Sequence, residues 1–358
     1  MKRIYLDTAL LAMPNYAIDA DTGQELIDRI IHFSELADPG VPLKLIISND
    51  AEDMLWGNNL GPDYDQIDQF LELMELKHIY SANDLLQRYQ FLFQHCARAA
   101  DVNLIEVDGV TNFVSYPELP EVSPAQLLDE TQRVFATAAA LAIVQQQVRV
   151  GSAFYASPSS HYNVRATLNT ICGAGSHLLE PPPVDIQATV STFTHLRDLV
   201  SSDVADELWR VAETAHDIHF SITLGALALQ VEAGEGVNIS VLNKFAIGSE
   251  FVHSLKQVEC WGNNRYSGAA RELCSQIVAG KCNRQINPFS LTGQHVRSFD
   301  GARAWRTHLT NSGLGLRLMY WQGENGIEFA TVDVKSGERI DIGSEAPAAA
   351  LDIRGCFG

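Results

Sequence analysis

Short apolar runs alternate with longer amphipathic segments along the first 110 residues, and this alternation limits the possible folds most. The short runs have the length of buried strands and cover residues 2–8, 42–48 and 102–107. The segments between them carry apolar residues at helical spacing and cover residues 23–37, 49–56, 64–76 and 82–98. Strands that alternate with helices form parallel sheets covered by those helices. The sequence therefore predicts an acidic α/β domain over residues 1–115.

The last third of the chain has a pattern typical of an antiparallel sheet. A helical segment precedes three strand-like runs, at residues 268–282, 302–309, 316–322 and 327–334 respectively. Gly323 and Gly326 enclose a short hairpin turn between the last two runs. We expect a basic α+β domain over residues 251–345 and a mobile tail over residues 346–358.

The middle of the chain is punctuated by prolines. Residues 116–185 are expected to form a linker and a long helix, with an Ala-rich stretch in the helix and a loop-rich part after it. The triple proline at 181–183 is a stiff spacer, so we place a boundary there. Residues 186–250 are expected to be a helical or mixed region. Helical patterns cover 186–200 and 203–217, and strand-like runs cover 220–232 and 237–242.

Charge is distributed unevenly along the 358 residues. The formal net charge is −19, and an acidic protein as a whole repels nucleic acid and anionic membranes. Residues 1–150 carry −14 and residues 151–250 carry −7, whereas residues 251–320 carry +6 and residues 321–358 carry −4. The segment 251–320 is therefore a basic island whose charge favours binding to phosphate.

Arginine supplies seven of the nine cations of this basic island, and aromatic residues are interleaved with them. The aromatic residues, including those just past its end, are Trp261, Tyr266, Phe289, Phe299, Trp305, Tyr320 and Trp321. Arginine binds phosphate through two parallel hydrogen bonds, and aromatic rings stack on unpaired bases. This composition predicts an RNA-binding surface. The alternative is that the arginines pair with carboxylates elsewhere in the chain.

Cysteine spacing and hydropathy indicate a cytoplasmic protein. The six cysteines are far apart and form no CxxC pair, as expected of free thiols in a reducing compartment. The first residues lack the pattern of a secretory signal, and the longest apolar run is too short to cross a bilayer. We expect no membrane association. The sequence also has no P-loop, GxGxxG motif or GxSxG elbow.

Residues from Ala270 to Ile342 resemble toxin domains of the RelE/HigB type. The resemblance rests on a leading helix followed by the runs DGARAWRTHL, GLRLMYWQ and GIEFATVDV, and it covers about a fifth of the chain. Members of that family are ribosome-dependent mRNA endonucleases that use basic and aromatic side chains in place of a metal ion. The resemblance thus implies an antiparallel sheet, RNA or the ribosome as partner, and no cofactor.

Carried over to this sequence, the resemblance places candidate catalytic residues on two strands. Arg306 lies on the first strand, and Arg317 and Tyr320 lie on the second. The family often has a His, Arg or Tyr near the end of the sheet, where this chain has Lys335 and Arg339 with no Tyr after them. His308 shares a strand face with Arg306 and is a substitute acid–base group. Lys335 and Arg339 are also candidates for phosphate binding, as are Arg284, Arg297 and Arg303.

The opening run IYLDTALL resembles the first strand of PIN-type nuclease domains. In that family a strand ends in a metal-binding Asp, and several carboxylates hold Mg²⁺ or Mn²⁺ at the edge of a parallel sheet. The resemblance assigns metal binding to Asp7 and Glu52, with Asp50 and Asp53 as alternatives to Glu52, and Asp84 or Asp101 as a later member. The other interpretation is that Asp7 and Asp50 cap turns between strands and helices.

The sequence thus predicts a toxin-like or defence-type effector that binds RNA through the basic island and cleaves it there. One alternative is a non-enzymatic adaptor that docks to a protein partner, with the Ala-rich helix at 131–148 and exposed aromatic residues as its interface. A second alternative is a metal-dependent PIN-like nuclease. Each of these is compatible with an oligomer.

Overall fold

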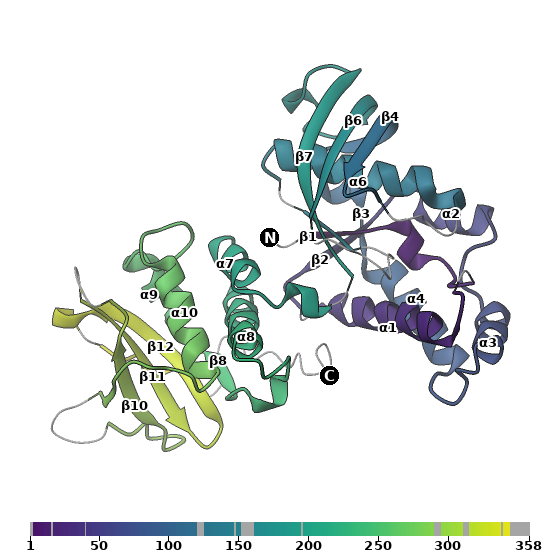
Figure 1. Cartoon of the computed structure of the whole chain (residues 1–358). Coiled ribbons are helices and arrows are strands. Elements are labelled where there is room, and N and C mark those ends of the chain that lie inside the picture. The colour runs from purple at the N-terminus through teal and green to yellow at the C-terminus, as the bar shows by residue number, and fades with distance from the viewer. Residues whose placement is uncertain are drawn as a thin grey trace. The chain divides into compact units, whose positions relative to one another are not determined.

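Helices combine with two sheets, one mixed and one mostly antiparallel, in this computed structural model. It describes residues 3–15, 17–39, 41–119, 125–146, 148–151, 161–194, 196–289, 295–310, 315–337 and 339–343. The chain divides into two compact units between Asp198 and Leu199, the first unit preceding this point except for a short piece at residues 40–42. Figure 1 shows the elements of both units. The tail predicted at residues 346–358 lies outside the described residues.

A seven-stranded mixed sheet forms the first unit, in the order β3-β2-β1-β5-β7-β6-β4. The parallel strands are β1 (Arg3–Leu6), β2 (Lys44–Ile47), β3 (Ala97–Arg98), β5 (Arg149–Gly151) and β7 (Val184–Phe193). The antiparallel strands are β6 (His161–Cys172) and β4 (Glu106–Tyr116). The parallel α/β core predicted for the start of the chain is thus extended by an antiparallel edge.

Six α-helices belong to this unit in the part of the chain described. They are α1 (Ala20–Leu36), α2 (Ala51–Gly57), α3 (Tyr64–Leu73), α4 (Ala82–His95), α5 (Ala99–Val102) and α6 (Leu128–Ile143). Short 3-10 turns are η1 (Thr8–Leu11), η2 (Ala125–Leu127), η3 (Ser176–Leu178) and η4 (Leu196–Leu199), the last of which reaches the second unit. Helix α6 packs against β4, β6 and β7, and its Ala-rich part is buried from Val134 to Leu141. The Ala-rich helix is therefore core, and its predicted role as an interface is wrong.

A five-stranded sheet in the order β8-β12-β11-β10-β9 forms the second unit together with helices. The strands are β8 (Phe245–Ile247), β9 (Ile286–Pro288), β10 (Arg303–His308), β11 (Leu316–Gly323) and β12 (Gly326–Val334). The helices are α7 (Ser202–Arg210), α8 (Ala215–Glu232), α9 (Phe251–Gln257) and α10 (Ser267–Val278), with 3-10 turns η5 (Ile239–Val241) and η6 (Lys335–Gly337). The predicted helix and antiparallel meander are confirmed, and β8 adds a strand that pairs in parallel with β12.

Several predictions for the middle of the chain are wrong. Residues 220–232 form helix α8 instead of a strand, because this helix is buried on nearly all sides by α7, α10 and β8 and so has no polar face to reveal its period. Residues 186–193 belong to strand β7, where every second side chain is buried or partly buried. Residues 237–242, expected to be a strand, contain the 3-10 turn η5. The triple proline joins β6 to β7, which pair with each other in one sheet, so it marks a hairpin within the first unit.

The structure also describes the state of the cysteines and the length and hydropathy of the helices. Cys96, Cys172, Cys260, Cys274 and Cys282 are free thiols, and Cys356 lies outside the described residues. Within the described ranges, no helix is both long enough and apolar enough to cross a bilayer.

Candidate nucleic-acid site on the second sheet

One face of the second sheet packs against helices, and the other face carries three of the predicted site residues, Arg306, His308 and Arg317. Leu318 and Tyr320 of β11 belong to the core that also contains Phe251 of α9 and Leu273 of α10. Because side chains alternate along a strand, Arg317, Met319 and Trp321 lie on the opposite face. Ala304, Arg306 and His308 share that face on β10, since Ala304 pairs with Trp321 and His308 with Arg317. We call this face the outer face.

Five basic side chains gather at one end of the outer face, and we call them the cationic cluster. They are Arg284, Arg306, His308, Arg317 and Lys335. The strand register brings His308 directly opposite Arg317, with Arg306 two residues earlier on the same face. Lys335 follows the last residue of β12, and its backbone N–H donates to the carbonyl of Gly315 at 3.2 Å.

The side chain of Arg284 is held in this cluster by hydrogen bonds to backbone carbonyl groups. Its Nη1 donates to the carbonyl oxygens of His308 at 2.8 Å and of Leu309 at 2.6 Å. These two hydrogen bonds fix the end of β10, which carries His308. Arg306 and Arg317 also interact with other groups of the chain. The acidic residue Asp333 of β12 pairs with Arg317 of β11.

The electrostatics of His308 show that these cations act together. Partial desolvation lowers the pKa of the His308 imidazole, and the charges of Arg317, Lys335, Arg306 and Arg284 lower it further, in that order. Each cation opposes a further positive charge on the ring. The exposed imidazole is therefore neutral at physiological pH and can accept a proton. Desolvation and the charge of Arg306 also lower the pKa of Arg317, while a guanidinium stays charged throughout the physiological range.

Tyr320 is not part of this cluster. Only 2 % of the residue is exposed, and it contacts the helix-facing core, which includes Phe329. Burial raises the pKa of its phenol well above the ordinary value. The resemblance to RelE/HigB-type domains implies a catalytic Tyr320 beside Arg317, but three residues along a strand place the two side chains on opposite faces.

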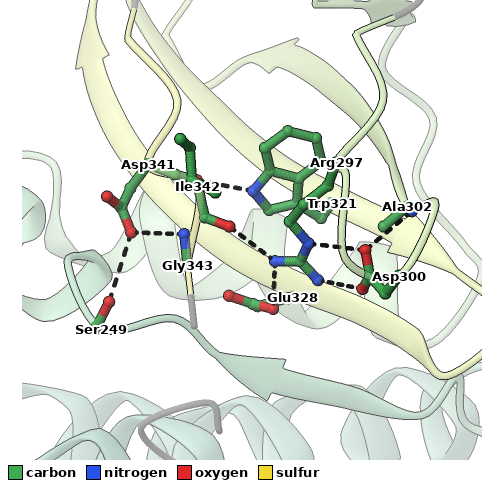
Figure 2. Close-up of polar contacts among 9 residues, drawn as sticks. All are labelled: Ser249, Arg297, Asp300, Ala302, Trp321, Glu328, Asp341, Ile342 and Gly343. Carbon is green, nitrogen blue, oxygen red and sulfur yellow. Dashed lines mark hydrogen bonds and ion pairs between the residues drawn. The ribbon is translucent and has the colours of Figure 1, made fainter. Parts of the chain in front are cut away.

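Arg297 is held inside the second unit by ion pairs. Its guanidinium donates to Asp300 Oδ1 at 3.0 Å and Oδ2 at 2.6 Å and to Glu328 Oε2 at 2.7 Å. The guanidinium also lies over the rings of Phe299 and Trp321. Figure 2 shows the contacts of Arg297 with Asp300 and Glu328, and Trp321 beside them. The predicted role of Arg297 in phosphate binding is therefore unsupported, and the alternative of pairing within the chain holds for this residue.

The other predicted phosphate-binding arginines lie elsewhere. Arg303 is exposed on β10, but it shares the face of Trp305 and Thr307, which is opposite that of His308. Arg339 is exposed on the segment after η6, where its carbonyl accepts a hydrogen bond from Thr331. Two further cations of the basic island form ion pairs within the second unit, Arg271 with Asp206 and Lys281 with Glu235, both at 2.8 Å.

The two predicted metal ligands of the first unit have other partners. Asp7 is fully buried at the end of β1, and its Oδ1 accepts from Thr131 Oγ1 at 2.8 Å and from the backbone N–H of Ala9 at 3.2 Å. Burial raises the pKa of the Asp7 carboxyl to about 7. Glu52 pairs with Arg98. Asp7 thus caps η1, as the alternative interpretation proposed.

Sequence reasoning missed an ionic network beside Asp7. Arg133 of α6 lies 3.1 Å from buried Glu130 and 3.4 Å from Asp50. Asn49 donates to Glu106 at 2.5 Å. Asn49 and Asp50 lie more than 50 positions before their partners Glu106 and Arg133, and no local motif links the two segments. Among the residues described, no group of three or more His, Cys, Asp or Glu side chains is arranged to hold a metal ion.

Comparison with known proteins adds no relative to this picture. No family model, curated protein or solved structure matches the chain.

Proposed function

We propose that the cationic cluster binds single-stranded RNA and cleaves it without a metal ion, as a toxin-like or defence-type effector would. The observation that carries the proposal is an exposed histidine at one end of the outer face, where desolvation and four permanent cations lower the pKa of its imidazole. Four cations beside the carboxylate of Asp333 leave a net positive charge among these five side chains, and positive charge attracts a polyanion. A neutral imidazole among them supplies a base next to the bound phosphate.

The chemistry follows from these roles. His308 takes the proton of a ribose 2′-hydroxyl, and the 2′ oxygen attacks the adjacent phosphorus. Arg306 and Arg317 bind the non-bridging oxygens, whose negative charge grows in the transition state. The bond from phosphorus to the 5′ oxygen breaks, and water protonates that oxygen. The products are a 2′,3′-cyclic phosphate and a 5′-hydroxyl end, so DNA, which lacks the 2′-hydroxyl, is bound but not cut.

The test compares variants of the full chain on fluorescein-labelled single-stranded RNA. Arg306→Ala with Arg317→Ala should weaken binding at least tenfold. Arg303→Ala removes an exposed arginine from the other face of the same strand and should change binding less than twofold. His308→Ala should retain binding and lose cleavage, because it removes the base and leaves the cations. Cleavage should persist in EDTA.

Three results would contradict the proposal. Equal losses in the Arg303 variant and the double variant would show that only overall charge matters. Cleavage that requires Mg²⁺ or Mn²⁺ would favour a metal-dependent PIN-like activity. Absence of RNA binding by the wild-type chain, on free RNA and on ribosomes, would favour the adaptor alternative.

A further inference from the structure

A short segment crosses the outer face of the second sheet, at the end away from His308. We call residues Arg339–Gly343 the strap. Ile340 packs against a small apolar cluster that includes Ala304, Trp321 and Ala330. The indole Nε1 of Trp321 donates to the carbonyl of Asp341 at 2.7 Å. Apolar contact and hydrogen bonding therefore both hold the strap on this part of the sheet.

Arg297 and Asp341 fix the strap in one position. Arg297 Nη1 donates to the carbonyl of Ile342 at 3.1 Å, besides its ion pairs with Asp300 and Glu328. Figure 2 shows these contacts converging on one guanidinium. The carboxylate of Asp341 accepts from the backbone N–H of Gly343 at 2.9 Å and from Ser249 at 3.4 Å.

Gly343 allows the strap to lie close to the ion pair of Arg297 and Glu328. A Cβ at this position would come within 2.3 Å of Glu328 Oε1 and 2.8 Å of Arg297 Nη1, and its backbone has a φ of +75°. Any other residue would push the strap away from the ion pair. The strap is thus shaped to lie against this surface.

The surface under the strap has the features of a base-stacking site. Trp321 is only 1 % exposed, and the ring of His295 lies 5.6 Å from it, with Phe289 6.0 Å beyond. Trp321 and Arg317 share the outer face four residues apart on β11, a distance of about 14 Å along a strand. Proteins that bind single strands combine cations with aromatic rings on which bases stack. Here the cations lie at one end of the outer face, and the strap covers the aromatic end.

We propose that the strap is an autoinhibitory cover that occupies the base-binding part of the RNA site. It rests on the function proposed above, because the site it covers is the continuation of the cationic cluster. With the strap in place, RNA contacts only the cations. When the strap leaves, a nucleotide farther along the bound strand stacks on the uncovered aromatic residues, and RNA binds more tightly.

Two isoleucines of the strap give a matched pair of variants. Ile340 packs into the apolar cluster, whereas Ile342 is 61 % exposed. Ile340→Ser should loosen the strap, and Ile342→Ser makes the same chemical change without removing a buried contact. Asp341→Ala is a second way to loosen it, since it removes the contacts to Ser249 and to the backbone of Gly343. None of these residues belongs to the cationic cluster.

The experiment measures hydrogen exchange of the strap and affinity for fluorescein-labelled single-stranded RNA, both on the full chain. We expect faster exchange and at least fivefold tighter RNA binding for Ile340→Ser and Asp341→Ala, and neither effect for Ile342→Ser. Faster exchange with unchanged or weaker binding would overturn the cover, and so would unchanged exchange in both loosening variants. If the wild type binds RNA through Arg306 and Arg317, and the strap variants bind RNA with unchanged affinity, only the autoinhibitory cover is refuted. If no variant binds RNA, the proposed function fails with it.

Discussion

At the scale of single residues, His308 illustrates how neighbouring side chains set the chemistry of a group. Partial desolvation lowers the pKa of its imidazole, and four cations from three strand ends and one loop lower it further. The ring is thus neutral over a wider range of pH than an isolated histidine. The same cations attract phosphate, so binding and base strength are coupled in this cluster.

Removing one of these cations should raise the pKa of His308. Arg306→Gln deletes a positive charge next to the ring, so the imidazolium costs less to form and the pKa moves up towards the ordinary value. NMR titration of the His308 ring measures this shift directly. In the same variant, the acidic limb of the pH profile for RNA cleavage should move to higher pH. Arg303→Gln, on the other face, is the control, and an equal shift there would contradict the assigned neighbourhood.

Asp7 leads to a prediction about stability in the first unit. Its pKa is raised to about 7, so the folded unit keeps a proton that the unfolded chain releases near pH 4. Stability therefore falls as the pH rises from about 4 to about 7. Asp7→Asn keeps the acceptor for Thr131 and carries no charge. It should stabilise the unit at pH 8 by at most about 4 kcal/mol, with little effect at pH 4.

Hydrogen exchange of peptides from β1 and α6 measures the stability change caused by Asp7→Asn, because these elements surround the carboxyl group. Exchange in the variant should be slower than in the wild type at pH 8 and similar at low pH. A variant that is equally or less protected at pH 8 would show that the Asp7 carboxylate is stabilised by its surroundings after all.

At the scale of elements, the alternation of strand β11 separates two residues that look equivalent in the sequence. Arg317 is directed to the outer face and Tyr320 to the helices. Tyr320→Phe should therefore leave RNA cleavage within twofold of wild type. Tyr320→Ala should destabilise the second unit by about 3–5 kcal/mol, because it leaves a cavity in the core. Loss of cleavage by a folded Tyr320→Phe variant would restore the catalytic role.

Elements with a clear period could be predicted from the sequence, and elements buried on all sides could not. Helix α1 has one apolar side, so its period identifies it, and two short apolar runs around a glycine turn identify the hairpin of β11 and β12. Helix α8 is apolar on nearly all sides, so the sequence shows no helical period and the prediction of a strand over residues 220–232 is wrong. The end of β10 carries His308 at a predicted position, but the cations around it come from four segments whose pairing depends on the whole sheet.

At the scale of the whole molecule, the net charge of −19 conceals a local positive field. Much of the basic island is neutralised within the second unit, since Arg271, Lys281 and Arg297 all have carboxylate partners. The sequence could show the charge asymmetry but not this pairing, which depends on tertiary contacts. The proposed function therefore rests on the few cations grouped around His308.

This count predicts the salt dependence of RNA binding. If the four permanent cations of the cluster neutralise phosphates, the logarithm of the binding constant should fall with the logarithm of salt concentration with a slope of about −3. Full engagement of the nine cations of the basic island would give a slope of about −6. Fluorescence anisotropy measured from about 50 to about 300 mM KCl distinguishes the slope of about −3 from the slope of about −6. A slope steeper than about −5 would move the interface beyond the cluster.

The ion pair of Arg297 also has an evolutionary consequence. It couples positions that are far apart in the chain, and none of its members can change alone without leaving a buried charge unpaired or a side chain in Gly343's place. We expect these positions to be inherited together, as Arg-x2-Asp at 297–300, Trp-x6-Glu at 321–328 and Asp-x-Gly at 341–343. Such a signature can recognise distant descendants of the same ancestor after the surrounding residues have diverged.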